Sequence, residues 1–299
     1  MVNAAVMCAL IPYSEFSQAS IKLIDFDGIA EDASSTKKAS DVEGVDFSRF
    51  VGSRRTRDYE RALNTGVAGS PNLVFVTSRM SSGAHTSKLV GVGRMALQAK
   101  ALTLAIVIRP PQSEGEKGLE PMLADFKRLS EAVDTLVIIP ESRLQKLGGC
   151  DLHFNDVSAN NSDLIVYAVR CVSDLLTIPG LIGLDFNDVR SVLKEQGTAR
   201  MGIGISSGEN RAVKAAHEAI TSPLLEDICI HQATGAIVNI AGGPDTAIHE
   251  VNEACTLIEE ALGEDADIVF GSIVDPNIGA SVRVTVLFCG LGETSKTVV

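Results

Sequence analysis

Apolar and polar positions alternate along the chain in a way that predicts strands and helices following one another. Short apolar runs rich in Val and Ile, typical of buried strands, lie at 21–26, 72–77, 103–108, 135–139, 199–205, 236–240, 267–272 and 282–288. Apolar residues at helical spacing predict helices at 57–63, 119–132, 187–195, 209–220 and 245–262, and one ending near Ala99. Strands that alternate with helices favour a parallel sheet with helices on both faces.

The first apolar segment, residues 2–10, fits either a helix or a strand by periodicity. The next strand, 21–26, follows after too few residues for a crossover helix between parallel strands. We therefore expect a helix at 2–10. Residues 28–56 are polar and lack periodicity, which predicts a long surface excursion.

A longer apolar run at 156–178 has the spacing of a central helix that joins two halves of the chain. In the second half the last two strands follow one another without a helix between them. The predicted fold is therefore α/β: a doubly wound, mostly parallel sheet domain, a long central helix, and a second, smaller α/β domain with a mixed sheet. The tail 292–299 is expected to be flexible.

The stretch 179–190, PGLIGLDFNDVR, places two carboxylates where a loop becomes a helix. Asp185 and Asp188 are three residues apart, so both lie on one side of the first helical turn and can act on one water or cation. Equally, Asp185 suits the N-cap and Asp188 the third helical position, and capping alone explains both residues. On the residues alone, capping is favoured.

Composition narrows the class of protein. The 299 residues carry a formal net charge of −12, which argues against a surface for nucleic acid or anionic membranes. No signal peptide and no apolar run of about 18 residues is present, so we expect no membrane insertion and a cytoplasmic location. The six cysteines are scattered and predict buried free thiols. His217, His231 and His249 lack metal-ligand spacing, and Gly242–Asp245 predicts a turn and an N-cap.

Residues 179–290 resemble the C-terminal half of FtsZ, the tubulin-like cell-division protein. The resemblance rests on PGLIGLDFNDVRSVL, ARMGIGISSGENRA, AITSPLLED, TGAIVNIAGGPD, HEVNEACTLIEE and IVFGSIVDPNIGASVRVTV. It continues more thinly in NLVFVTSRMSSGAHTSK, LAIVIRPPQSEGEKG and SEAVDTLVIIPESRLQKL. It implies four parts: a GTPase-like domain at 1–155, a central helix at 156–178, an activation domain at 179–291 and the tail.

Membership of this family implies subunits that stack head to tail with GTP between them. One subunit's upper face binds GTP, and the acidic loop of the next subunit completes hydrolysis in trans. Asp185 and Asp188 match the two catalytic aspartates of that loop, which polarise water and an associated Mg²⁺ or K⁺. The Asn that precedes them in the family is Gly183 here.

The nucleotide-binding half departs from the family. The phosphate loop GGGTGTG reads SSGAHTS here, so only Gly83 and Thr86 match. A lost glycine that needs a positive φ costs about 1 to 2 kcal/mol, and the new side chain crowds the phosphates. Four such losses predict weak or absent binding of GTP or GDP, although Ser81, Ser82, His85 and Lys88 can still attract an anion.

The other nucleotide loops match in part. Glu114 matches a ribose-contacting Glu, and Asp163 matches a guanine-contacting Asp. The chain is expected to begin at about the family's first helix, without the strand and glycine-rich loop that precede it. The adaptor-binding C-terminal peptide has no counterpart.

Three functions remain open. The first is an FtsZ-like cell-division protein, cytoplasmic or at the septum, that binds little GTP itself and docks on FtsZ-type subunits, its own copies or a separate FtsZ. There it stimulates hydrolysis in trans or caps the filament. The second is a polymerising GTPase with a remodelled phosphate loop. The third is a non-enzymatic structural protein in which the two carboxylates only cap a helix.

Overall fold

The computed structural model describes two short backbone segments near the start of the chain and most of the remainder. The described residues are 7–12, 22–25, 71–80, 83–98, 100–110, 119–143, 168–169, 172–176, 178, 180–194, 196–225, 228–263 and 265–291.

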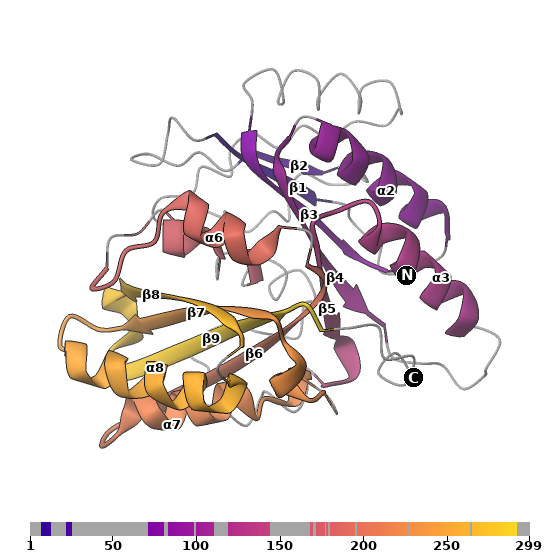
Figure 1. Cartoon of the computed structure of the whole chain (residues 1–299). Coiled ribbons are helices and arrows are strands. Elements are labelled where there is room, and N and C mark those ends of the chain that lie inside the picture. Colours follow the sequence, from indigo (N-terminus) through magenta and orange to yellow (C-terminus); the bar gives the residue numbers. More distant parts are fainter. Residues whose placement is uncertain are drawn as a thin grey trace, which may run out of the picture.

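Nine strands form one sheet in the order β2-β1-β3-β4-β5-β6-β9-β7-β8 (Figure 1). Strands β3 to β6 are parallel to one another. Strand β1 is antiparallel to both of its neighbours, β2 and β3, and β9 is antiparallel to β6 and β7. Strand β8 pairs with β7 in parallel, so the second half of the sheet is mixed, as predicted. The strands are β1 (Met7–Pro12), β2 (Lys22–Asp25), β3 (Pro71–Arg79), β4 (Leu102–Arg109), β5 (Thr135–Pro140), β6 (Gly197–Ser207), β7 (Gly235–Gly242), β8 (Asp267–Val274) and β9 (Ser281–Cys289).

Helices cover both faces of the first half of the sheet. Every residue of β4 and β5 is buried, as expected for parallel strands with cover on each side. Helices α2 (Gly83–Gln98) and α3 (Leu119–Ser130) enclose one apolar core. Residues 168–169 and 172–176, which are helical, pack into the core on the other face. The predicted doubly wound arrangement is confirmed.

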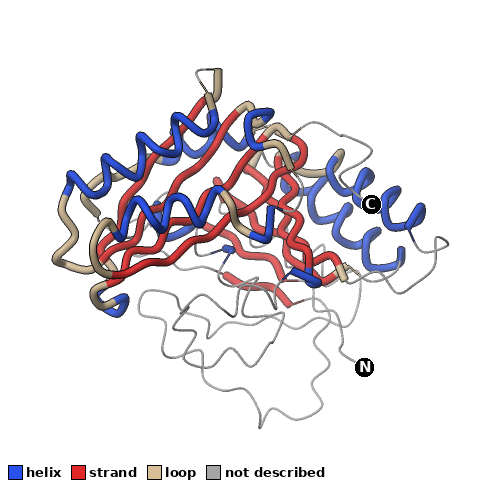
Figure 2. The backbone as a smooth tube through the Cα atoms, turned by 90° about the horizontal axis from the view of Figure 1, so that it is seen from below, coloured by secondary structure: helices blue, strands red, loops and turns tan. Residues whose placement is uncertain are grey.

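The second half is likewise covered on both faces. Helices α7 (Arg211–Ile220) and α8 (Ile248–Leu262) share one core with strands β7 and β9, whereas α6 (Phe186–Leu193) packs into the core on the opposite face. Seen from below, the strands run through the middle of the molecule and the helices lie outside them (Figure 2). Short 3₁₀ helices, η4 (Pro223–Leu225), η5 (Ile230–Gln232) and η6 (Pro276–Ile278), join the larger elements.

The predicted strands and the helices from α2 onward are confirmed, with ends shifted by a few residues. The helix expected at 2–10 is wrong, because Met7–Pro12 is a strand that lies between β2 and β3. Its antiparallel pairing is the physical reason, since antiparallel neighbours need no crossover helix and a short connection suffices. The expectation that the chain begins at about the family's first helix rested on a helix at 2–10, so it is wrong as well; the expected lack of the family's glycine-rich loop stays a prediction.

Several predictions fall outside the described residues: the excursion at 28–56, the helix at 57–63, most of the central helix and the tail. The cysteine prediction holds only in part, since Cys289 is buried, Cys255 is half-buried and Cys229 is exposed. Within the described part of the chain, no helix combines the length and the hydropathy that a membrane crossing requires.

Candidate functional site

Helix α6 is amphipathic and short, and its apolar side fixes its position. Phe186, Val189, Val192 and Leu193 are buried in the core against the sheet, at the spacing of one helical face. Near its carboxyl end, Leu193 accepts a hydrogen bond from the Thr135 hydroxyl at the start of β5. The helix is therefore held along its length, and its first turn is held with it.

The first turn of α6 carries both candidate catalytic carboxylates in a reciprocal capping box. Asp185 is the N-cap, and its Oδ1 accepts hydrogen bonds from the backbone N–H groups of Asn187 and Asp188, at 2.7 and 2.9 Å. In return, Asp188 Oδ2 accepts from the Asp185 N–H at 2.9 Å. The capping role expected from the spacing is confirmed.

Capping uses one oxygen of each carboxylate. Asp185 Oδ2 and Asp188 Oδ1 accept no hydrogen bond from any residue that the structure describes. Asp185 is exposed and Asp188 is half-buried. Each side chain thus has one oxygen that holds the backbone and a second oxygen that can meet a water, a cation or a partner.

The loop before α6 lies against the edge strand β8. Ile182 forms an antiparallel bridge with Ser272, whose N–H donates to the Ile182 carbonyl at 2.9 Å. A Cβ at Gly180 would overlap the Ser272 carbonyl oxygen, so the chain passes β8 too closely for any larger residue. At Gly183, by contrast, a Cβ would meet nothing within 4 Å. The loop is therefore anchored at Gly180 and Ile182 and open at Gly183.

One apolar side chain beside the carboxylates faces outward. Leu181 is 45% exposed and is among the few large hydrophobic side chains that are exposed in the described part of the chain. The segment from Gly180 to the first turn of α6 thus carries an exposed apolar residue as well as the two carboxylates.

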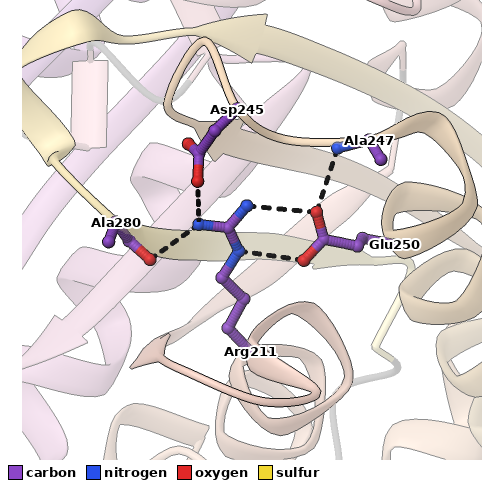
Figure 3. A network of polar contacts seen from close by, with 5 residues as sticks. All are labelled: Arg211, Asp245, Ala247, Glu250 and Ala280. Carbon is purple, nitrogen blue, oxygen red and sulfur yellow. Dashed lines mark hydrogen bonds and ion pairs between the residues drawn. The ribbon is translucent and has the colours of Figure 1, made fainter.

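A buried guanidinium forms a second polar cluster at the amino end of α7 (Figure 3). Arg211 donates from Nε and Nη2 to the two carboxylate oxygens of Glu250, at 2.9 and 3.1 Å. Its Nη1 donates to Asp245 Oδ2 and to the Ala280 carbonyl, each at 2.8 Å. Glu250 Oε2 also accepts from the Ala247 N–H at 2.9 Å. We call these five residues the Arg211 cluster.

The sequence prediction for this region was incomplete. The predicted turn lies at 243–246, where the Thr246 N–H donates to the Gly243 carbonyl, but Asp245 is not the N-cap of α8; that position is Ala247, and Asp245 binds Arg211 instead. The partners of Arg211 lie 34 to 69 residues away in the sequence. In the sequence Arg211 is simply a residue near the start of the predicted helix 209–220, and nothing in the local pattern indicates that it is buried or that its partners are so distant.

The charges in the cluster stabilise one another. The hydrogen bonds from Arg211 hold the pKa of the Glu250 carboxyl below its usual value, and the Ala247 N–H lowers it further. The same hydrogen bonds, led by those with Glu250, raise the pKa of Arg211. Both groups are therefore ionised at neutral pH.

The predicted nucleotide-binding residues are described only in part. Gly83 is the first residue of α2, which follows β3 closely, and Thr86 lies in the first turn of that helix with 1% of its surface exposed. Glu114 and Asp163 lie outside the described residues, as do Ser81 and Ser82. The strand, loop and helix order expected around a phosphate is present, while the nucleotide-binding role of the four residues stays a prediction.

Other candidates do not form a site. His217, His231 and His249 are all exposed. Among the described residues, no group of three or more His, Cys, Asp or Glu side chains is placed to hold a metal ion. Burial raises the pKa of the Cys255 and Cys289 thiols to about 12, so neither is a reactive thiolate at neutral pH.

Known proteins resemble this chain in both sequence and structure. Residues 197–292 match the model of the FtsZ family C-terminal domain. A structure described as an empty FtsZ dimer from M. jannaschii is 29% identical, with a TM-score of 0.69 over 80% of this chain and 68% of that one. A point mutant of M. jannaschii FtsZ is 30% identical, with a TM-score of 0.66 over 79% and 70% of the two chains.

More distant structures share the fold. CetZ1 from Haloferax volcanii, described as a GDP-bound monomer, is 16% identical, with a TM-score of 0.63 over 81% of this chain and 72% of that one. CetZ2 from the same organism, described as a GTPγS-bound protofilament, is 18% identical, with a TM-score of 0.59 over 81% and 73%. The family match in the second half, the identity to FtsZ and the shared fold lead to one conclusion: this chain belongs to the FtsZ/tubulin superfamily.

Proposed function

We propose that this protein is an FtsZ-type cytoskeletal subunit that assembles head to tail with FtsZ-type subunits, either its own copies or a separate FtsZ. In this proposal Asp185 and Asp188 act in trans on the GTP of the neighbouring subunit. The protein's own upper face binds GTP or GDP weakly or not at all.

The observation that carries the proposal is the geometry of the two carboxylates. Both are fixed by the capping box, and each has one oxygen left without a hydrogen bond from the described residues. Fixed oxygens of this kind need little reorganisation to orient a water molecule or to complete the coordination of Mg²⁺ or K⁺ supplied with the neighbour's nucleotide.

The comparisons support assembly at the level of the family. The M. jannaschii FtsZ structure is described as a dimer and the CetZ2 structure as a protofilament. An interface that joins like subunits head to tail repeats the same two faces along a filament. A subunit that carries the two catalytic carboxylates but binds GTP poorly would stimulate hydrolysis of the last nucleotide in a filament. It would then block further growth, because it offers no GTP to the next subunit.

Two features of the phosphate loop support weak nucleotide binding by this chain's own upper face. Only Gly83 and Thr86 match the family's glycine-rich loop, so side chains occupy positions where backbone N–H groups would wrap the phosphates. Thr86 is buried, so its hydroxyl is enclosed by the protein. Glu114 and Asp163 would contact the ribose and the base in a nucleotide that is bound.

The proposal is tested by two binding measurements on the full chain. Calorimetry with GTP is expected to give no binding heat at micromolar concentrations, and co-sedimentation with GTP-assembled filaments of M. jannaschii FtsZ is expected to bring the chain into the pellet. A micromolar affinity for GTP would refute the weak upper face. A chain that stays in the supernatant, and that also fails to associate with itself, would refute assembly.

A second candidate is a polymerising GTPase with a remodelled phosphate loop. One observation favours it: α2 begins at Gly83, four residues after β3 ends at Arg79, which is the order of strand and helix that can present backbone N–H groups to an anion. The same calorimetry separates the two functions. Binding of GTP that disappears in the His85→Ala, Lys88→Ala double variant would favour this second candidate.

A further inference from the structure

Strand β8 is the last strand at one end of the nine-stranded sheet (Figure 1). It pairs with β7 on one side. On its other side, within the described part of the chain, it is bonded only through the bridge between Ser272 and Ile182. The first four residues of β8, 267–270, lie beyond that bridge. We call the outer side of these four residues the β8 edge.

The backbone groups of the β8 edge can be placed from the hydrogen bonds on either side of it. Along a strand, the N–H and C=O groups of successive residues point alternately to one neighbour and the other. The N–H of Asp267 points toward β7, since it donates to the Thr234 carbonyl at 3.0 Å. The N–H of Ser272 points outward and donates to the loop before α6 at 2.9 Å. Ile268 and Phe270 therefore also point outward, and no described residue is hydrogen-bonded to their backbone groups.

Apolar side chains flank these open backbone groups. Ile268 and Phe270 are half-buried and pack against the core beneath α8, to which Leu257 of that helix also contributes. On the opposite face of the sheet, α6 runs inward, since Val192 in its last turn lies beside Gly235 at the start of β7. The β8 edge thus combines unpaired backbone groups with half-exposed apolar side chains, as the addition of a further strand requires.

The net charge of the whole chain lies in the segment that contains β8. Residues 215–282 include 12 of the 38 Asp and Glu residues and no Lys or Arg. The rest of the chain holds the other 26 acidic residues together with all 26 Lys and Arg, so its formal charge is zero. The excess of carboxylates is therefore confined to the part of the chain that runs from α7 through β7, α8 and β8.

Four exposed carboxylates belong to the residues that lead into the β8 edge. Glu259 and Glu260 lie in the last turn of α8, Asp265 lies in the four-residue connection that follows, and Asp267 is the first residue of β8. The carboxyl end of a helix favours cations, yet this last turn carries no basic residue. The surroundings of the β8 edge therefore favour a positively charged partner.

We propose that the β8 edge binds an extended basic segment of a partner protein, which adds a strand to the sheet. The backbone of that segment pairs with Ile268 and Phe270, and its β-branched side chains pack beside theirs. Its Lys or Arg side chains meet Asp265 and Asp267. A second copy of this chain is a poor occupant, because edge-to-edge pairing would bring like charges together. The inference does not depend on the proposed function.

The test uses three fluorescent peptides with the full chain. The first is an eight-residue peptide in which Val alternates with Lys. The second has the same sequence with its four central amides N-methylated, so that it keeps the charge but loses the N–H donors of a strand. The third has Glu in place of Lys. Binding is measured by fluorescence anisotropy, and hydrogen exchange is followed at residues 268–270.

A double variant, Asp265→Asn with Asp267→Asn, tests the location, and Glu209→Gln with Glu253→Gln is its matched control. Each pair removes two exposed negative charges. Glu209 lies before α7 and Glu253 in the second turn of α8, outside the residues that lead into the β8 edge. None of the four side chains forms an ion pair or hydrogen bond with the described residues, so both variants should keep a Tm within about 2 °C of the wild type.

We expect the basic peptide to bind and to slow exchange at residues 268 and 270 several-fold, because their N–H groups gain acceptors. The N-methylated peptide and the Glu peptide should each bind at least about tenfold more weakly. The Asp265→Asn, Asp267→Asn variant should bind the basic peptide about tenfold more weakly, whereas the control variant should stay within about twofold of the wild type.

Five results would overturn the inference. If the basic peptide does not bind at millimolar concentration, the β8 edge takes no basic strand. If the N-methylated peptide binds equally well, charge alone attracts the peptide and no strand is added. If the Glu peptide binds as tightly, the carboxylates do not select the occupant. If both double variants lose binding equally, the net charge of the chain is responsible. If sedimentation shows a dimer that the basic peptide dissociates, the occupant is a second copy of this chain.

Discussion

At the scale of single residues, Asp185 and Asp188 show that capping and chemistry need not exclude one another. The spacing of the two residues was compatible with either role. The structure assigns one oxygen of each carboxylate to the capping box and leaves the other free of hydrogen bonds from the described residues. The cap therefore positions the side chains that we propose to act on a neighbour's nucleotide.

The capping role predicts the stability of two variants at one position. Asp185→Ala removes the acceptor of two backbone N–H groups and should lower the free energy of unfolding by about 1 kcal/mol. Asp185→Ser keeps an acceptor of similar rank and should change it by only a few tenths of a kcal/mol. Urea denaturation of the full chain measures both, and equal losses would contradict the cap.

Substitution by Ala is expected to have opposite effects on stability at Gly180 and Gly183, the two glycines described in the loop before α6. Gly180→Ala should destabilise the protein by about 1 to 3 kcal/mol, because its Cβ would overlap the Ser272 carbonyl and disturb the bridge to Ile182. Gly183→Ala should be neutral or stabilise by up to about 1 kcal/mol, since nothing lies within 4 Å and the unfolded chain loses freedom. Thermal unfolding followed by circular dichroism distinguishes them. Equal shifts in Tm would show that the loop does not pack against β8.

At the scale of elements, most of the helices and strands could be predicted from the local pattern of apolar and polar residues. The buried strands of the first half and the amphipathic helices α6, α7 and α8 follow from apolar spacing and turn residues. The helix expected at 2–10 failed because a short apolar segment fits both periods, and the antiparallel partners that decide the matter lie elsewhere in the chain.

The candidate site was predictable to a similar extent. The capping box follows from residues three apart, so its spacing was enough to predict it. The Arg211 cluster joins residues 34 to 69 positions apart, and only the fold brings them together. The assignment of Asp245 as an N-cap failed for this reason, since a distant guanidinium competes for its carboxylate.

The cluster makes the start of α8 sensitive to acid. The pKa of Glu250 is lower in the folded protein than its ordinary value of 4.5, so on acidification the unfolded state binds the proton first. The stabilisation is therefore complete above about pH 4.5 and is lost as the pH falls through the folded-state pKa. Glu250→Gln should unfold more easily at pH 7 and show a weaker dependence on pH below 4.5, as measured by urea midpoints. A pH dependence identical to that of the wild type would contradict this role.

At the scale of the whole molecule, one sheet connects the two halves. Strands β5 and β6 are paired at only three positions, and β6 then continues into the mixed half of the sheet. Thr135 at the start of β5 also binds the end of α6. The first half of the chain and the loop that carries Asp185 are therefore linked by a short region around β5, β6 and α6. In our proposal these two regions meet different neighbouring subunits.

We propose above that this chain acts on a neighbour's nucleotide through Asp185 and Asp188. The most direct test measures GTP turnover by M. jannaschii FtsZ as the full chain is added, with the Asp185→Asn, Asp188→Asn double variant as the comparison. Asn keeps the cap acceptors but lacks the charge. We expect the wild-type chain to raise turnover and the double variant to co-sediment as before but to lower the added rate about 10²- to 10⁴-fold. Equal turnover with both proteins would contradict it.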